Sequence, residues 1–357
     1  MFGTMKYGAL SGKTRAMFGR LLRKENYEEL VQKKSVSEVV SYLKNNTHYR
    51  IILSDVDENN IHRGQLENLL KRDLVKDYEK LLRFTHGDLK KFIDLLYVKI
   101  EIESLKLIFR VFEAGHAESS LLEGSLLFLS KCDKLDIPKL ALSRNLEEFL
   151  LGLKGTDYYD VLRPFASENN EKRLFSMEMA LDLYYLRTEQ TAFKKILSPK
   201  DAAIALEFAG FESDIFNIFW VYRSKTFYKA DPEVIQSYIL PLIYKLKRGT
   251  LDELIRAKNL EEFAEILGKT PYRFLFQGDS QQRFEHRYGE FIYKLHKRWF
   301  RRNPFSIACV LSYLRMKETE LANIFSIIEG IRYRLSEENI KEYIIGIEQN
   351  DFIRERV

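Results

Sequence analysis

The chain has 357 residues, 45% of them hydrophobic, and a formal net charge of +5 from 57 basic and 52 acidic residues. This length allows two or three domains with packed cores. The mild charge argues against a dedicated duplex-binding protein, which is usually more basic or has a strongly clustered face. The two cysteines, Cys132 and Cys309, lie far apart without metal-ligand spacing, which indicates small buried residues in a reducing compartment.

Helix-compatible residues dominate the chain. Glycine and proline are scarce, at 17 and 7 residues, while long segments consist mainly of leucine, lysine, glutamate and alanine. Alternating strand patterns bounded by Asn-Gly or Asp-Gly turns are absent from the sequence. No apolar run reaches the ~18 residues needed to span a bilayer. We therefore predict an all-α protein whose helices are separated by short polar breaks.

The first 24 residues contain no acid and carry six basic residues, which are Lys6, Lys13, Arg15, Arg20, Arg23 and Lys24. This composition is also found in organelle transit peptides. Residues 16–18 and 21–22 are apolar, however, and fit the buried side of a structural helix better. Arg20 and Arg23 lie one helical turn apart, so Arg15, Arg20 and Arg23 are candidates for a partner contact. The alternative is that they are ordinary surface charges.

One sequence motif occurs three times. Its copies are KSVSEVVSYLKNNTHY at residues 34–49, RNLEEFLLGLKGTDY at 144–158 and KNLEEFAEILGKTPY at 258–272. The copies share a glutamate (Glu38, Glu148, Glu262) and a tyrosine (Tyr49, Tyr158, Tyr272), and the first copy has one extra residue. Each glutamate fits a first-turn acid facing the helix dipole. The predicted N-caps of these helices are Ser35, Asn145 and Asn259.

A second motif follows each copy of the first, at residues 101–110, 214–223 and 320–329. Each copy starts with an acid, and Ser104, Asn217 or Asn323 follows three residues later. Apolar residues then recur at spacings of three and four, which place them on one helical face. The pair Glu101 and Ser104 also suggests catalysis, but a polar pair beside an apolar stripe more often orders a helix contact.

The two motifs keep the same order in three consecutive stretches of about 115 residues, the size of an ordinary domain. We therefore predict three similar helical units, at residues 1–115, 116–228 and 229–357. Similar units joined head to tail form either an open array or a closed ring. An open array usually needs specialised polar caps, and neither end unit has a clear one. The sequence therefore favours a closed, pseudo-threefold arrangement around a central depression.

Residues 283–302 carry the strongest candidate surface. Lys294, Lys297, Arg298, Arg301 and Arg302 follow the spacing of one helical face, and Arg283 and Arg287 extend it towards the N-terminus. Such a stripe can contact anionic headgroups, an acidic partner or nucleic-acid phosphates, or it can remain a solvated face.

The sequence contains no recognisable catalytic or metal motif. Its six histidines are scattered, and no His-Glu-x-x-His helix, phosphate-binding glycine-rich loop or nucleophile elbow occurs. We therefore expect no catalytic residue, no metal site, no cofactor and no small-molecule substrate.

Three features together resemble a known family. They are the opening segment from Tyr7 through Arg15 to Leu22, the segment 101–110 with its counterpart at 214–223, and the triple helical unit. In this combination, over essentially its whole length, the chain resembles the C subunit of the vacuolar/archaeal-type (V/A-type) rotary ATPases, called the d subunit in eukaryotic vacuolar pumps.

The resemblance implies a funnel-shaped, all-helical, pseudo-threefold protein with a central socket. It also implies a peripheral location on the cytoplasmic face of the membrane, with one copy per complex. The partners would be the central-stalk subunits, received in the socket, and the membrane rotor ring below. The function would be non-catalytic coupling between them, for ATP-driven or ATP-synthesising ion transport.

Two other hypotheses remain open. The first is a helical-repeat adaptor that binds RNA or an acidic protein through the stripe at residues 283–302. The second is a membrane-surface protein held directly by lipid headgroups. The coupling hypothesis expects no nucleic acid as partner.

Overall fold

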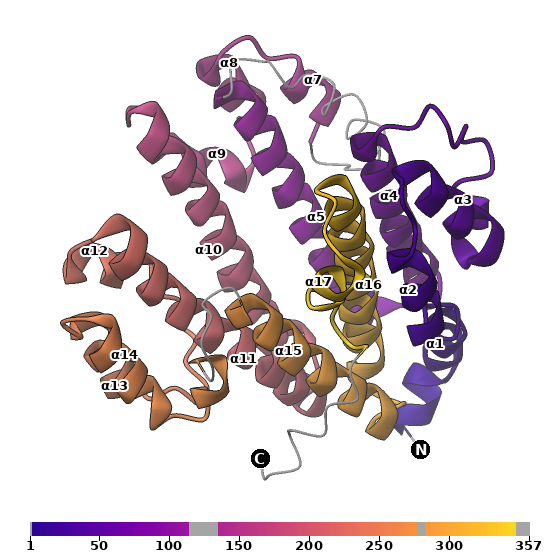
Figure 1. Ribbon diagram of the computed structural model, residues 1–357. Helices are drawn as coiled ribbons and strands as arrows, with labels where there is room; N and C mark the ends of the chain where they lie inside the picture. Colours follow the sequence, from indigo (N-terminus) through magenta and orange to yellow (C-terminus); the bar gives the residue numbers. More distant parts are fainter. Residues whose placement is uncertain (1, 114–134, 277–282, 348–357) are drawn as a thin grey trace.

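A computed structural model describes residues 2–113, 135–276 and 283–347. Within these residues every regular element is a helix and no strand occurs, which confirms the prediction of an all-α protein. No helix in the described ranges is both long and apolar enough to cross a membrane. Figure 1 shows long helices at the centre of the molecule and shorter ones at its periphery.

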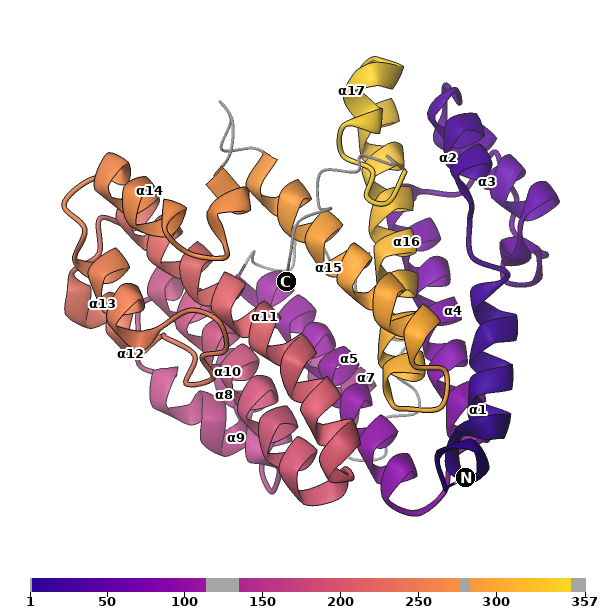
Figure 2. The same ribbon diagram turned by 90° about the horizontal axis from the view of Figure 1, so that it is seen from below.

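Three pairs of long helices form the body of the protein. They are α4 (Arg63–Leu82) with α5 (Gly87–Glu113), α10 (Asn170–Ile196) with α11 (Pro199–Arg223), and α15 (Arg283–Arg302) with α16 (Ala308–Arg332). The helices pack in a circuit from α4 to α5, α10, α11, α16 and back to α4, while α15 packs along α16. In Figure 2, α15 crosses the molecule between α11 and α16.

Short helices precede each pair. Before the first pair lie α1 (Phe2–Phe18), α2 (Lys24–Val31), α3 (Val36–Asn46) and η1 (His48–Ile51). Before the second lie α7 (Ile137–Ala141), α8 (Leu146–Gly152), α9 (Asp157–Leu162) and η2 (Arg163–Phe165). Before the third lie η3 (Ser224–Tyr228), α12 (Pro232–Ser237), α13 (Arg248–Arg256), α14 (Leu260–Gly268) and η4 (Arg273–Phe276). The last described helix is α17 (Glu337–Lys341).

Of the two predicted unit boundaries, one lies within the described residues. The boundary near residue 115 lies outside the described residues, as does Cys132. The boundary at residue 228 lies between the end of η3 and the start of α12. Cys309 is buried, as the sequence indicated.

The predicted N-caps of the repeated motif are confirmed. The side-chain oxygens of Ser35, Asn145 and Asn259 accept hydrogen bonds from the backbone amides of Glu38, Glu148 and Glu262, at 3.1, 2.8 and 2.9 Å. Each of these glutamates in turn accepts a hydrogen bond from the backbone amide four residues before it. The reciprocal bonds satisfy amides that a helix start would otherwise leave unpaired. The same local sequence therefore starts α3, α8 and α14.

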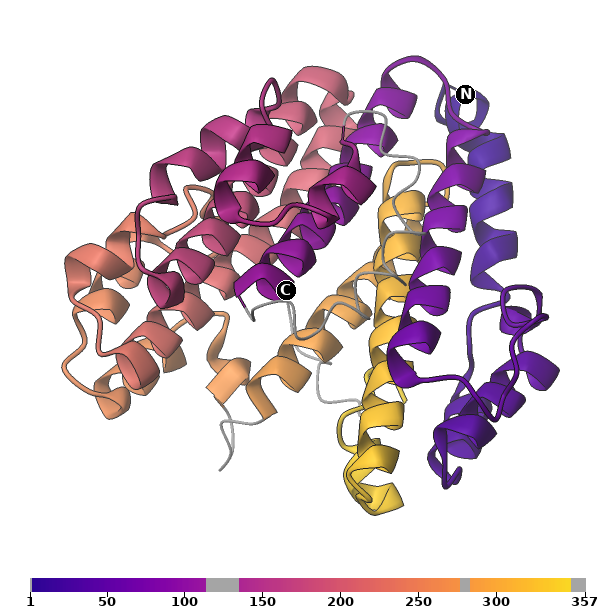
Figure 3. The ribbon, with the colours of Figure 1, turned by 90° about the horizontal axis from the view of Figure 1, so that it is seen from above.

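The predicted apolar stripes of α5, α11 and α16 are buried, and each is covered by short helices from further along the chain or from its start. The α5 stripe packs in one hydrophobic cluster with α7, α8 and α9. The α11 stripe packs with α13 and α14. The α16 stripe packs with α2 and α3, and α3 lies in the first copy of the motif. Figure 3 shows the α1–α4 segment beside α16.

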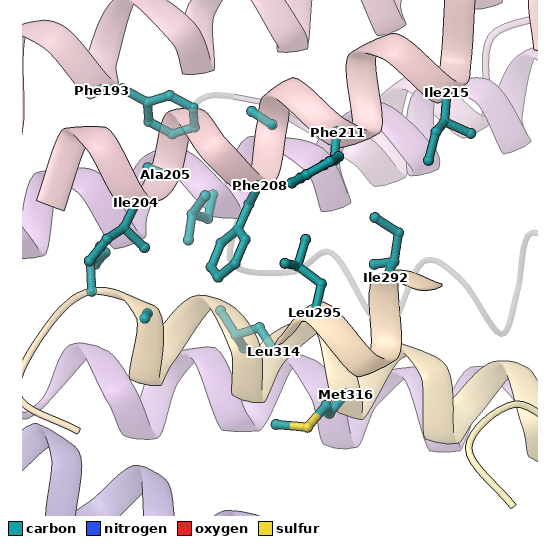
Figure 4. Close-up of a cluster of buried hydrophobic side chains, with 14 of the residues drawn as sticks. Phe193, Ile204, Ala205, Phe208, Phe211, Ile215, Ile292, Leu295, Leu314 and Met316 are labelled. Carbon is teal, nitrogen blue, oxygen red and sulfur yellow. The ribbon is translucent and has the colours of Figure 1, made fainter. Parts of the chain in front are cut away.

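The largest core lies where the second and third helix pairs meet. Figure 4 shows Phe208 and Phe211 of α11 facing Leu295 of α15 and Leu314 of α16. All four side chains are buried. Full burial of a side chain of this size contributes about 1.5–3 kcal/mol, so this cluster binds the second pair firmly to the third.

Candidate functional site

The three repeated tyrosines each donate a hydrogen bond to one of the three repeated acids. The pairs are Tyr158 with Glu101 at 2.8 Å, Tyr272 with Asp214 at 2.6 Å, and Tyr49 with Glu320 at 2.7 Å. Every pair is buried, and every pair joins different copies. The acid of the first copy binds the tyrosine of the second, the second binds the third, and the third binds the first.

The residues around these pairs are structural rather than reactive. The Asp214 carboxylate also accepts hydrogen bonds from the backbone amides of Tyr244, Lys245 and Leu246. The carboxamides of Asn217 and Asn323 each pair with one backbone amide and one carbonyl, at Leu240 and Ile345. The Ser104 hydroxyl donates to the Ile100 carbonyl within its own helix. This agrees with the interpretation that the repeated acid and its Ser or Asn order helix contacts.

A buried charge network surrounds the Tyr49 and Glu320 pair. Lys317 is fully buried, and its Nζ lies 2.9 Å from Glu320 Oε1, 3.0 Å from Asp73 Oδ2, 2.8 Å from Tyr49 Oη and 2.8 Å from His48 Nε2. Burial alone lowers the pKa of Lys317, but the charges of Glu320 and Asp73 outweigh it and raise the pKa. This network, which we call the Lys317 network, ties η1 and α4 to α16.

A central cavity of about 410 Å³ lies inside the circuit of long helices. Residues of α4, α5, α10, α11, α15 and α16 line it, so all three helix pairs contribute. A second cavity of about 300 Å³ between α4, α5 and α16 shares Lys99, Glu103 and Glu318 with it. The central cavity is therefore the place where side chains from all three copies meet.

Ion pairs run along the wall of the central cavity. Glu318 accepts from Lys99 at 3.1 Å and from Arg315 at 3.1 Å. Arg315 also pairs with Glu212 at 3.5 Å and donates to the Tyr288 hydroxyl at 3.0 Å. Burial alone lowers the pKa of Arg315, but the surrounding hydroxyl and carboxylates outweigh it and raise the pKa.

One lining acid differs from the rest. Glu189 of α10 accepts a hydrogen bond from the Tyr185 hydroxyl at 3.0 Å, and no cation of the described residues lies within ion-pair distance of it. Burial and then the charge of Glu212 raise the pKa of Glu189 to about 7. The Glu189 carboxyl is therefore only partly ionised at neutral pH.

The candidates on α15 divide into two groups. Arg283 pairs with Glu342 at 3.2 Å, Arg287 donates to the Leu275 carbonyl at 2.9 Å, Lys294 pairs with Glu290 at 3.3 Å, and Lys297 lies over the Tyr293 ring. Arg298, Arg301 and Arg302 are exposed. Among the described residues no acid forms an ion pair with these three arginines. We call Arg298, Arg301 and Arg302 the arginine end of α15.

The structure brings part of the first helix to this arginine end. The Arg15 guanidinium of α1 donates to the Phe300 carbonyl at 3.1 Å and lies over the Phe300 ring. Phe18 packs on the same ring, with centroids 4.5 Å apart. Arg20 and Arg23 follow the end of α1 and instead line a shallow pocket with residues 46–48. The sequence candidates thus form two surfaces, and Arg15 belongs with α15.

The sequence prediction missed the Lys317 network and the charged wall of the cavity. One signal was available, because Arg315, Lys317, Glu318 and Glu320 fall within six residues of an otherwise largely apolar helix. Charges at such positions need buried partners. Which partners they find depends on residues far away in sequence, so the signal could not identify the site. No cluster of potential metal ligands occurs in the described part of the chain.

Comparison with known proteins gives a consistent result. The profile of the ATP synthase (C/AC39) subunit family matches residues 10–343. The A-type ATP synthase C subunit of Methanosarcina acetivorans is 28% identical, covering 97% of this chain and 94% of its own length. Those of Methanosphaera stadtmanae and Methanocaldococcus jannaschii are each 24% identical, covering 94% and 96% of this chain and 86% of their own lengths.

Proposed function

This chain belongs to the ATP synthase (C/AC39) subunit family, and on that premise we propose that it couples the central rotor stalk to the membrane rotor ring of a V/A-type rotary ATPase. Family membership confirms that the chain is a non-catalytic part of such a complex. The proposed location is peripheral, on the cytoplasmic face of the membrane. The proposed partners are the stalk subunits and the ring.

The cyclic order of the three tyrosine–acid pairs carries this proposal. Glu101 binds Tyr158, Asp214 binds Tyr272, and Glu320 of the third copy returns to Tyr49 of the first. Repeated units whose last member contacts the first form a closed ring, whereas an open array leaves both ends free. This supports a pseudo-threefold funnel built from units 1–115, 116–228 and 229–357, each lending its short helices to the preceding unit.

The central cavity is the proposed socket of that funnel. It lies on the inner side of the helix circuit and has both apolar and charged walls, as a surface that holds another protein requires. A rigid body is needed to transmit torque, and close-packed helices with an ion pair between copies, from buried Lys317 to Asp73, provide one. Coupling in this proposal depends on stiffness and on many contacts, with no reactive group involved.

The arginine end of α15 supports a second contact surface. Three exposed arginines without an acidic partner among the described residues favour an anionic partner surface. The acidic stretches of a partner protein, or the region of the headgroups beside the ring, have that charge. We propose that Arg298, Arg301, Arg302 and Arg15 face the membrane-ring side, and that Arg20 and Arg23 form a separate, smaller contact.

The test is assembly and coupling in membranes. Pull-down from gently solubilised membranes is expected to recover stalk and ring subunits with the wild-type chain. The triple change Arg298→Glu, Arg301→Glu and Arg302→Glu is expected to lower this recovery at least tenfold. The matched control Arg283→Glu removes one exposed, internally paired charge and should leave recovery unchanged. ATP-driven ion transport that persists after deletion of the chain contradicts the proposal.

The same arginines keep the adaptor hypothesis testable. RNA binding through phosphate contacts weakens steeply as the salt concentration rises. The slope of log affinity against log salt concentration is close to the number of contacts. Tight RNA binding with such a slope, lost in the triple variant, favours the adaptor. Binding to anionic vesicles without any protein partner favours direct attachment to lipid.

A further inference from the structure

We propose that the central cavity receives one Lys or Arg side chain of the docked stalk partner, which forms an ion pair with the carboxylate of Glu189. This inference rests on the proposed function, because it names the chemistry of the partner that enters the socket. The inference includes the release of a proton from the Glu189 carboxyl when the partner docks.

The argument begins with the charge balance of the lining. Five acids and three cations line the central cavity. The cations are Lys99, Lys106 and Arg315. Four of the acids are paired: Glu212 and Glu318 with Arg315, and Glu103 and Asp182 with Lys106. Among the described residues Glu189 accepts a hydrogen bond from the Tyr185 hydroxyl and forms no ion pair. The acids of the lining therefore outnumber its cations by two, and Glu189 is the one lining acid that forms no ion pair with a described cation.

The groups around Glu189 come from every helix that lines the cavity. Its own helix gives Tyr185, α11 gives Glu212, α5 gives Lys99, and α16 gives Glu318 and Arg315. Tyr78 of α4, and Tyr288 and His296 of α15, complete the wall. Burial, and then the charges of Arg315 and Lys99, lower the pKa of His296 well below its ordinary value, so this ring stays neutral. The two nearby carboxylates oppose ionisation of Glu189 more than the single Lys99 favours it.

The cavity has the shape and chemistry for a long cationic side chain. Its volume of about 410 Å³ far exceeds the ~15 Å³ that a single water requires. Phe193, Phe208 and Phe216 give it apolar walls beside the charged groups. Lys and Arg place an apolar stem against such walls and keep the charged head for a polar partner. A partner carboxylate would instead face the excess of acids.

Proton release follows from this pairing. In the free protein the Glu189 carboxyl is protonated below about pH 7. A cation at ion-pair distance favours the ionised form and lowers the pKa, so the bound state carries one proton fewer. Affinity must therefore rise with pH, by about tenfold between pH 6 and pH 8 for one group that titrates near 7. Binding at pH 6 releases close to one proton per complex.

The experiment measures binding of purified central-stalk subunits to the full chain by calorimetry at pH 6, 7 and 8. Two buffers with different ionisation enthalpies give the number of protons released. We expect about tenfold tighter binding at pH 8 than at pH 6 for the wild type. Glu189→Gln should bind more weakly at pH 8, with a flat pH profile. Glu103→Gln, a cavity acid with a lysine partner, should keep the wild-type profile.

Each outcome distinguishes the two proposals. No binding of the stalk subunits to the wild type at any pH overturns the proposed function. Binding with the same pH dependence in Glu189→Gln overturns the Glu189 pairing and leaves the proposed function standing. Circular dichroism of the variant verifies folding, and the ¹³C carboxyl shift of Glu189 in the wild type gives its titration directly. Of the Lys→Met and Arg→Met variants of the stalk partner, one should also abolish the pH dependence of binding. If none of them does, the pairing is contradicted.

Discussion

The change Lys317→Met tests the closure of the first copy onto the third. Methionine keeps the length of the side chain and removes its charge. The Lys317 side chain is 0% exposed and forms ion pairs with Glu320, which is 2% exposed, and Asp73, which is 14% exposed. Removing one partner of a buried ion pair costs about 3–5 kcal/mol, because the remaining charge is buried without compensation.

The structure places the expected loss near the lower end of this range. Glu320 keeps the hydroxyl of Tyr49 and the backbone amide of Leu22 as donors, and Asp73 keeps His48. We therefore expect a loss of about 3 kcal/mol in the free energy of unfolding. The matched control is Lys99→Met, whose side chain is 39% exposed beside Glu318. This pair is less buried than that of Lys317, and Glu318 keeps Arg315 as a partner, so the control should lose less.

Urea-induced unfolding followed by circular dichroism measures both variants, with the slope m compared to the wild type. Addition of Asp73→Asn and Glu320→Gln to Lys317→Met removes the uncompensated charges and should recover at least about 1 kcal/mol. A loss in Lys317→Met no larger than that in Lys99→Met would refute the reasoning. It would mean that the network does not hold the first copy on α16.

Four further predictions also concern stability. Asn259→Ala removes the N-cap of α14 and should cost about 1 kcal/mol. Gly210→Ala should cost about 1–3 kcal/mol because its Cβ would lie 2.6 Å from the Tyr244 side chain, whereas Gly268→Ala, with open space, should not destabilise. Glu189→Gln should stabilise the free protein at pH 8 by about 1–3 kcal/mol and leave it unchanged at pH 4, because the raised pKa disfavours folding once the carboxyl ionises. Burial raises the pKa of Asp73, but hydrogen bonding to His48 and the charge of Lys317 outweigh burial and lower the pKa overall. The stability that Asp73 contributes should therefore be complete above about pH 4 and fall in more acidic solution. In an acid titration, Asp73→Asn should lack that loss.

The sequence by itself determined the helices and the way they start and bury their apolar faces. The caps at Ser35, Asn145 and Asn259 lie where the motif predicted them, since an N-cap bond joins residues three apart. The apolar stripes of α5, α11 and α16 are buried because helical periodicity alone defines a face. The basic face of α15 follows from the same periodicity.

Only the tertiary structure decided which elements meet. The sequence showed that the tyrosine and the acid repeat, but it did not show that each tyrosine binds the acid of another copy. Tyr49 and Glu320 are 271 residues apart, and no local pattern encodes that contact. The environment of Glu189 is similar, because the groups around it come from five other helices whose packing places them around one cavity. Contacts at this range depend on how complete faces fit together, which is a property of the assembled fold and not of any one segment.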